Sequence, residues 1–246
     1  MNTPIIKNVS RALKATVDFV MPIVCVDCGS EGSFLCASCL ANAPKLPINS
    51  CMKCAEHTAE HVRLCGDCAT LPPPLDRLVP IYRYGGPVRS AVHALKYRHI
   101  TAIAPTMAQP MSQASFARRA KLDCVAPTPM HADRLRERGY NQAALLAQNV
   151  ADNLQLRYIE DALTKTRPTP SQVELTRQER AFSLKNAFVA NYDFDDAHVL
   201  LIDDVCTTGN TLMNCAAALK RAGARRVSAV VFAKELINAE SVGETS

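Results

Sequence analysis

The spacing of the cysteines constrains this chain more than any other feature. Eight of its eleven cysteines lie within residues 25–68 as four C-x-x-C pairs: Cys25/Cys28, Cys36/Cys39, Cys51/Cys54 and Cys65/Cys68. A two-residue spacer lets both sulfur atoms of one tight turn point at one tetrahedral metal, and two such turns complete a four-cysteine zinc site. The segment is too short to build its own core, so metal binding would supply its folding energy. We therefore predict one or two structural Zn²⁺ ions with no chemistry of their own.

The grouping of the pairs is left open by the spacing. Sequential grouping leaves 7 and 10 residues between the pairs of each site, whereas interleaved grouping leaves 22 and 25. We favour the sequential grouping. His57 and His61 lie between the third and fourth pairs and could each replace a thiolate, but solvated loop histidines are the favoured interpretation. A disulfide framework is the alternative to metal, and it requires an oxidising compartment.

Composition changes along the chain predict four segments. Residues 1–22 have the pattern of an amphipathic helix, and residues 23–71 form the double zinc ribbon. Pro72, Pro73 and Pro74 then form a stiff linker. Residues 75–236 form the larger domain, and residues 237–246 form a polar tail. No apolar run approaches the roughly 18–20 residues of a membrane span, and Asp18 interrupts the apolar part of the N-terminus. We therefore expect a cytoplasmic protein without a membrane span.

The larger domain alternates apolar strands with helices. Strands are predicted over residues 78–84, 124–126, 199–202 and 227–232. Helices are predicted over residues 88–97, 101–119, 141–154 and 211–222, with Pro105 and Pro110 interrupting the second, and residues 171–187 read as a loop leading into a helix. This pattern is typical of an α/β fold with a mainly parallel sheet and flanking helices.

The most informative chemistry follows the strand over residues 199–202. Asp203 and Asp204 end that strand, and a hydroxyl-rich loop then leads into a helix; the loop contains Thr207, Thr208, Gly209, Asn210 and Thr211. Loop N–H groups and a helix N-terminus form a cradle for an anion, and ligands of open α/β sheets bind at the carboxyl ends of strands. The carboxylates suit sugar hydroxyls or a Mg²⁺ that the ligand carries. Phosphate beside a diol indicates a ribose 5-phosphate.

These residues resemble the phosphoribosyl pyrophosphate (PRPP) signature of type I phosphoribosyltransferases, which has four apolar residues, two acids and a T-T-G-x-T loop. The departures are Cys206 and Asn210, and Asn210 is expected to cap the following helix. More of the chain is similar to one branch, the ComF family with its GntX relatives. Residues 138–143 (RGYNQA), 169–172 (TPSQ) followed by Glu179 and Arg180, and 95–97 (LKY) match that family's segments in order. An N-terminal double zinc ribbon is also a family trait.

The resemblance implies a role for each matching residue. Asp203 and Asp204 are the implied catalytic acids, and they would hold the ribose hydroxyls. Residues 207–211 would hold the 5-phosphate, while Mg²⁺ would bind together with PRPP. The turn over residues 127–131 would receive the pyrophosphate, with Lys96, Arg134 and Arg138 as candidate partners for it. Arg136 suits either that role or a solvated helix face, and residues 167–180 would form a hood over the substrate.

The resemblance also implies a link to natural transformation, and so to single-stranded DNA or to a DNA-uptake or DNA-processing protein. Two alternatives stay open: a phosphoribosyltransferase with an unknown nitrogenous acceptor and no DNA role, and a PRPP-sensing regulator. The net charge of +5 falls to about +1 if eight thiolates bind two Zn²⁺, so overall charge does not predict nucleic-acid binding. The best candidates for stacking on bases are Tyr82, Tyr84, Tyr97 and Tyr140, although partly buried tyrosines are the favoured interpretation. The cationic side chains near the end of the last predicted helix are interpreted as a solvated face: Lys220, Arg221, Arg225 and Arg226.

Overall fold

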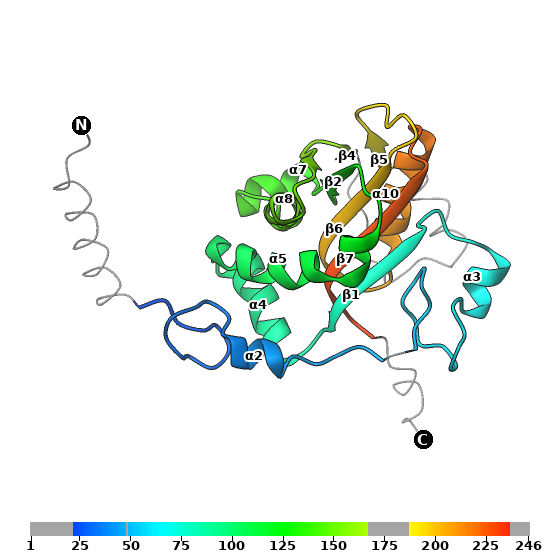
Figure 1. Ribbon diagram of the computed structural model, residues 1–246. Helices are drawn as coiled ribbons and strands as arrows, with labels where there is room; N and C mark the ends of the chain where they lie inside the picture. Colours follow the sequence, from blue (N-terminus) through cyan, green and yellow to red (C-terminus); the bar gives the residue numbers. More distant parts are fainter. Residues whose placement is uncertain (1–21, 48, 167–186, 237–246) are drawn as a thin grey trace, which may run out of the picture.

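A five-stranded parallel sheet forms the centre of the molecule. The computed structural model describes residues 22–47, 49–166 and 187–236. The strand order is β1-β7-β6-β2-β3 (Figure 1), with β1 at Arg77–Arg83, β2 at Cys124–Pro127, β3 at Arg157–Tyr158, β6 at His198–Cys206 and β7 at Arg226–Lys234. Every neighbouring pair is parallel. The carboxyl ends of the strands therefore share one edge of the sheet, and their amino ends share the opposite edge.

Both faces of the sheet are covered, which is why its central strands β2, β6 and β7 are mainly apolar. Successive side chains of a strand point to opposite faces, so Leu200 and Ile202 of β6 pack on one side while Val199 and Leu201 pack on the other. The first side is covered by α4 (Gly86–Tyr97), α5 (Ala104–Gln113) and α8 (Gln142–Leu154). The second side is covered by α10 (Asn210–Arg221) and by an antiparallel pair, β4 (Leu163–Lys165) and β5 (Phe188–Ala190).

The predicted fold class is confirmed, and three local expectations are corrected. β6 continues to Cys206, because Asp203, Val205 and Cys206 still pair with β7. Pro110 lies inside α5, and the break comes instead at residue 114, before α6 (Ser115–Arg119). Asn210 does not cap α10. It is the first helical residue, and Gly209 occupies the cap position without a side-chain hydrogen bond.

The cysteine-rich segments pack on the two sides of the edge strand β1 (Figure 1). The first, with α2 (Ala37–Ala41), contributes Cys25 and Leu35 to the same core as α4. The second, with α3 (Gly66–Thr70), contributes Ala55 to the core beneath α10. Backbone bonds join both to the strand: the Leu78 N–H donates to Met52 C=O (2.9 Å), and the Arg83 N–H donates to Pro44 C=O (2.8 Å). The predicted division of the chain near the prolines stays a prediction.

Several predicted segments lie outside the described residues. These are almost all of the amphipathic helix over residues 1–22, most of the loop over 171–187, the hood over 167–180 with its TPSQ motif, and the polar tail over 237–246. Within the described ranges, no helix combines the length and apolar character needed to cross a bilayer.

Candidate functional site at the carboxyl edge of the sheet

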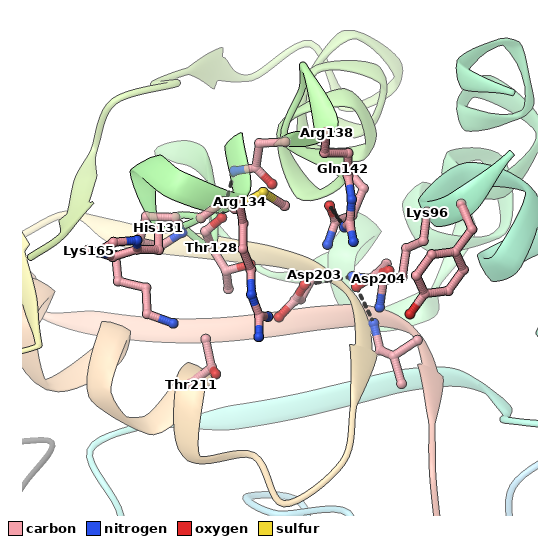
Figure 2. Close-up of a pocket in the computed structure, with 15 residues that line it drawn as sticks. Lys96, Thr128, His131, Arg134, Arg138, Gln142, Lys165, Asp203, Asp204 and Thr211 are labelled. Atoms are coloured by element: carbon pink, nitrogen blue, oxygen red, sulfur yellow. Dashed lines mark hydrogen bonds and ion pairs between the residues drawn. The ribbon is translucent and has the colours of Figure 1, made fainter. Parts of the chain in front are cut away.

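A polar cavity of about 250 Å³ opens at the carboxyl edge of the sheet, beside the ends of β2 and β6. Its floor is formed by Asp203 and Asp204 (Figure 2). Four cationic side chains surround these acids: Lys96 at the end of α4, Arg134 and Arg138 of α7 (Ala132–Arg138), and Lys165 of β4. Four cations against two carboxylates leave the cavity positive, so it suits an anion that also offers hydroxyl groups.

The two acids differ in their surroundings. Asp204 is 2% exposed, and its Oδ1 accepts the Val205 N–H at 2.9 Å. Its Oδ2 is buried and makes no hydrogen bond of acceptable geometry among the described residues. Asp203 is only half-buried, and burial together with the Asp204 carboxylate raises its pKa to about 7. A buried carboxylate oxygen that lacks a hydrogen bond of good geometry, beside a half-buried acid, keeps acceptor capacity that ligand hydroxyls would use.

Lys96 is one of the predicted candidates for the pyrophosphate, and its ammonium lies on the acid pair. The Lys96 Nζ atom lies 2.7 Å from Asp204 Oδ2, and its side chain is 19% exposed. This ion pair partly neutralises the acids, and it lowers the pKa of Asp203 against the two larger effects that raise it. Lys96 still lines the cavity, so its charge is shared between the acids and any bound anion.

Arg134 and Arg138 point into the cavity because they are four residues apart on α7, which places them on one face of that helix. Arg138 also donates from Nη1 to Gln142 Oε1 at 2.8 Å, and its guanidinium lies over the Tyr97 ring at 5.7 Å. Arg136 is 74% exposed and pairs with Asp133. Of the two interpretations left open for Arg136, the structure therefore shows the solvated helix face.

The threonine loop forms its own small hollow of about 60 Å³ beside the main cavity, with Asp203, Val205 and Thr211 lining both. Gly209 has φ +78°, a left-handed conformation that other residues adopt only with strain. Because α10 begins here without a side-chain cap, its first backbone N–H groups are available to an anion. The five predicted loop residues all line this hollow.

A buried lysine links the threonine loop to the second cysteine-rich segment. Lys234, at the end of β7, is 1% exposed. Its Nζ donates to the Thr207 C=O at 3.3 Å and lies 3.0 Å from Glu56 Oε1. Glu56 in turn accepts the Cys51 N–H on its backbone C=O at 2.8 Å. The Lys234 ammonium thus supports the threonine loop, and Glu56 of the cysteine-rich segment compensates its charge.

The turn after β2 offers fewer backbone donors than predicted. Pro127 and Pro129 have no N–H, and the Thr128 N–H donates to the Ile202 C=O at 3.0 Å. The remaining N–H groups of this turn are those of Met130 and His131, and both residues line the cavity. His131 also caps α7, accepting the Asp133 N–H on its side chain.

The cysteines form two groups of four, in the sequential order that we favoured. Within each group the sulfur atoms all lie within 4.8 Å of one another, and the groups contain Cys25, Cys28, Cys36 and Cys39, and Cys51, Cys54, Cys65 and Cys68. Individual sulfur–sulfur distances are 3.6–3.8 Å. A tetrahedral Zn–S bond of about 2.3 Å requires about 3.8 Å between sulfurs, so each group fits one Zn²⁺. The Cys39 N–H lowers the pKa of Cys36 to about 6, whereas burial raises the pKa of Cys39 in the same group. His57 and His61 are exposed and belong to neither group.

Sequence reasoning missed several residues that line the cavity. Lys165 comes from β4, which was not predicted, and burial and then Arg134 lower the pKa of its ammonium. Asn141 and Gln142 were noted only as part of a motif; here the Asn141 Nδ2 donates to the Thr128 C=O at 2.9 Å and so joins α8 to the turn after β2. No sequence pattern identifies β4, because its three residues, Leu163–Lys165, are too few to show the periodicity of a strand.

Comparison with known proteins identifies a phosphoribosyltransferase fold, the same class that the fold and the site indicate. The phosphoribosyl transferase domain family matches residues 138–242, a range that contains α8, the acid pair and the threonine loop. The protein therefore has a type I phosphoribosyltransferase-like α/β fold, preceded by a four-cysteine module.

Relatives that match most of this chain identify the particular family. The DNA utilization protein YhgH of Salmonella typhimurium is 32% identical over 198 residues, covering 78% of this chain and 87% of that protein. Competence protein F of Haemophilus influenzae is 29% identical over 201 residues, with the same coverage. Competence protein ComFC of Bacillus subtilis is 26% identical over 199 residues, covering 77% and 79%. The chain belongs to the ComF family, together with YhgH.

Solved structures with similar folds include the glutamine PRPP amidotransferase of B. subtilis. Its TM-score is 0.38 at 17% identity, covering 53% of this chain and 26% of that one. A hypoxanthine phosphoribosyltransferase from Staphylococcus aureus has a TM-score of 0.36 at 11% identity, covering 53% and 62%.

Proposed function

We propose that this protein binds PRPP together with Mg²⁺ at the carboxyl edge of the sheet, and that it serves DNA uptake or DNA metabolism. One observation carries the first part: the acid pair, the threonine-loop hollow and four cationic side chains meet around one connected site. The names of the relatives, which refer to DNA utilization and competence, support the second part.

Each chemical group of PRPP has a counterpart in the site. The threonine loop and the N-terminus of α10 suit the 5-phosphate. Asp203, and the Oδ2 of Asp204 that a ligand would share with Lys96, suit the ribose hydroxyls. Arg134, Arg138 and Lys165 suit the pyrophosphate, since guanidinium groups bind phosphate oxygens in pairs. Mg²⁺ would arrive on the pyrophosphate and neutralise part of its charge, which fits a cavity whose acids are already engaged by Lys96 and by one another.

Calorimetric titration of the zinc-loaded protein tests the first part of the proposal. We expect PRPP with Mg²⁺ to bind more tightly than either ribose 5-phosphate or pyrophosphate alone, because only PRPP fills the loop hollow and the cationic cavity together. Equal affinity for PRPP and pyrophosphate would contradict the role of the loop. A folded protein that binds none of the three would overturn the proposal.

Replacing the buried lysine beneath the threonine loop is expected to weaken this binding. Lys234→Met keeps the length of the side chain but removes the hydrogen bond to the Thr207 C=O and the positive charge below the 5-phosphate. A hydrogen bond to a charged group contributes roughly 1.5–3 kcal/mol, so we expect PRPP affinity to fall about tenfold. Lys220→Met is the matched control, because Lys220 pairs with Asp76 at 2.8 Å and lines neither hollow. Equal losses in both variants, measured by calorimetry, would contradict this role for Lys234.

A second hollow favours transfer chemistry over PRPP sensing. It has a volume of about 200 Å³, adjoins the main cavity through Lys96, Tyr97, Arg134 and Arg138, and adds His99 and Glu137. Tyr97 is 64% exposed there, so an aromatic acceptor has a ring to pack against. In such a transfer, the bond from the anomeric carbon to pyrophosphate breaks, an acceptor nitrogen bonds to that carbon, and the nitrogen loses its proton. Release of pyrophosphate that depends on a nucleobase or similar acceptor would establish turnover. If PRPP binds but no pyrophosphate is released in any mixture of acceptors, the PRPP-sensing regulator would be the remaining interpretation.

A further inference from the structure

A second recess lies at the amino edge of the sheet and belongs to no site described so far. Its volume is about 340 Å³, larger than that of the candidate site, and its lining is formed by Phe116, Arg119, Ala120, Lys121, His198, Arg225 and Arg226. His198 and Arg226 begin β6 and β7. His198 and Asp203 are five residues apart on β6, which corresponds to about 17 Å along the strand. The two sites can therefore be altered independently.

The carboxylates of Asp76, Asp123 and Asp196 near this edge already have partners, and Asp76 Oδ2 lies 2.8 Å from Lys220 Nζ as well as accepting a backbone N–H. Asp123 Oδ2 accepts the His198 N–H at 2.8 Å, and Asp76 Oδ2 accepts the Val227 N–H at 2.8 Å. Arg225 is engaged by Asp196 at 3.3 Å. Among the residues that the structure describes, no ion pair involves Arg119, Lys121 or Arg226, which are exposed. The lining of the recess thus includes four cationic side chains and no acidic one.

Aromatic rings complete the recess. The Phe116 ring is half-buried, with the Arg77 guanidinium over it at 4.8 Å and the His198 ring at its edge, 6.3 Å between centroids. Both nitrogens of His198 have partners: a carbonyl can only accept, so Nδ1 donates to the Lys121 C=O at 3.0 Å, and Nε2 lies 3.0 Å from Ser228 Oγ. Burial also lowers the pKa of this imidazole. Phe116 is therefore an aromatic ring beside cations, in addition to the tyrosines that the sequence offered.

We propose that the recess between α6 and the amino ends of β6 and β7 binds single-stranded DNA, with phosphates on Arg119, Lys121 and Arg226 and an unpaired base beside Phe116. Proteins that bind single strands combine a cationic groove with aromatic rings, because phosphates attract cations and bases have apolar faces. Duplex DNA keeps its bases stacked and cannot use the ring. The choice of DNA rests on the DNA-handling part of the proposed function, whereas the place and chemistry of the recess do not.

Fluorescence anisotropy with a labelled oligo-dT of about 20 nucleotides tests the proposal on the zinc-loaded full chain. The test variant is Arg119→Gln/Lys121→Gln. The matched control is Lys45→Gln/Arg63→Gln, which removes one lysine and one arginine from exposed positions in the cysteine-rich segments. Each phosphate contact contributes about 0.7 to the salt slope of single-strand binding. The test variant should therefore lose about 25-fold in affinity at 0.1 M salt and about 1.4 in slope. The control should lose neither.

Four outcomes overturn the proposal. If the wild-type protein does not bind oligo-dT at low salt, the recess is not a DNA-binding site. If the control variant loses as much affinity as the test variant, the DNA contact lies in the cysteine-rich segments. If oligo-U or duplex DNA binds more tightly than oligo-dT, the ligand of the recess is not single-stranded DNA. Phe116→Leu should weaken binding without changing the salt slope, and unchanged affinity in that variant removes the base contact. Titration of the test variant with PRPP separates this inference from the proposed function, because PRPP binding should survive it.

Discussion

Asp203→Asn/Asp204→Asn is expected to lower the affinity for PRPP at least about 100-fold at pH 8, which lies above the pKa of about 7 that burial and then Asp204 give Asp203. Two charged acceptors for ribose hydroxyls are lost together, and each hydrogen bond to a charged group contributes roughly 1.5–3 kcal/mol. The substitutions keep the size of the side chains, so the floor of the cavity keeps its shape. Calorimetry with Mg²⁺ and PRPP measures the effect. Asp152→Asn/Glu160→Gln removes two exposed acids outside the cavity and should bind as wild type does.

Stability measurements show whether the loss reflects the site or the fold. Burial and then the neighbouring Asp204 raise the pKa of Asp203 from 3.8 to about 7. Between those values the folded protein holds a proton that the unfolded chain releases, so this group makes folding stability fall as pH rises through the range. Asp203→Asn lacks that penalty and should melt at a higher temperature than wild type at pH 8, but not at pH 4. A variant that melts lower at pH 8 would indicate that the charged carboxylate stabilises the free protein.

Removing one of the cysteine groups is the second change with a large expected effect. Cys51→Ser/Cys54→Ser should lower the zinc content from two ions per chain to one, because the two groups are separate. Structural zinc contributes more than 10 kcal/mol to folding in isolated zinc-finger peptides. If even about 5 kcal/mol of that is lost here, the melting temperature falls by roughly 10–20 °C. Atomic absorption and thermal unfolding measure the two quantities.

The same variant should also bind PRPP less tightly at a temperature where it is still folded. Glu56 lies beside the altered pair and holds Lys234, which supports the threonine loop through Thr207. Cys124→Ala is the control, because Cys124 is buried in the sheet and belongs to neither group; its zinc content should stay at two. One zinc ion in the wild type, or two in the variant, would contradict the assignment of two independent sites.

Features encoded by a few adjacent residues could be predicted from the sequence. The C-x-x-C pairs gave two metal-sized groups, because each pair is one local turn. The threonine loop could be predicted for the same reason, because one strand, one glycine with positive φ and one helix follow each other directly. The parallel sheet followed from apolar strands that alternate with helices.

Contacts between distant segments could not be predicted in this way. Lys96 and Asp204 are far apart in the sequence, and only the packing of α4 over the end of β6 brings them to 2.7 Å. Lys165 projects from a strand of three residues, which is too short for its alternation to stand out. The recess at the amino edge joins α6 to the beginnings of two strands, so it exists only once the sheet has formed.

The position of the cysteine-rich segments has a consequence for the sheet itself. β1 is a terminal strand, and terminal strands expose unpaired backbone groups that recruit further chains into aggregates. Here Met52 and Pro44 accept the Leu78 and Arg83 N–H groups, from segments that pack on either side of the strand. The cysteine-rich module therefore shields one border of the sheet from intermolecular strand pairing. A chain that began at β1 would present that border to its own copies.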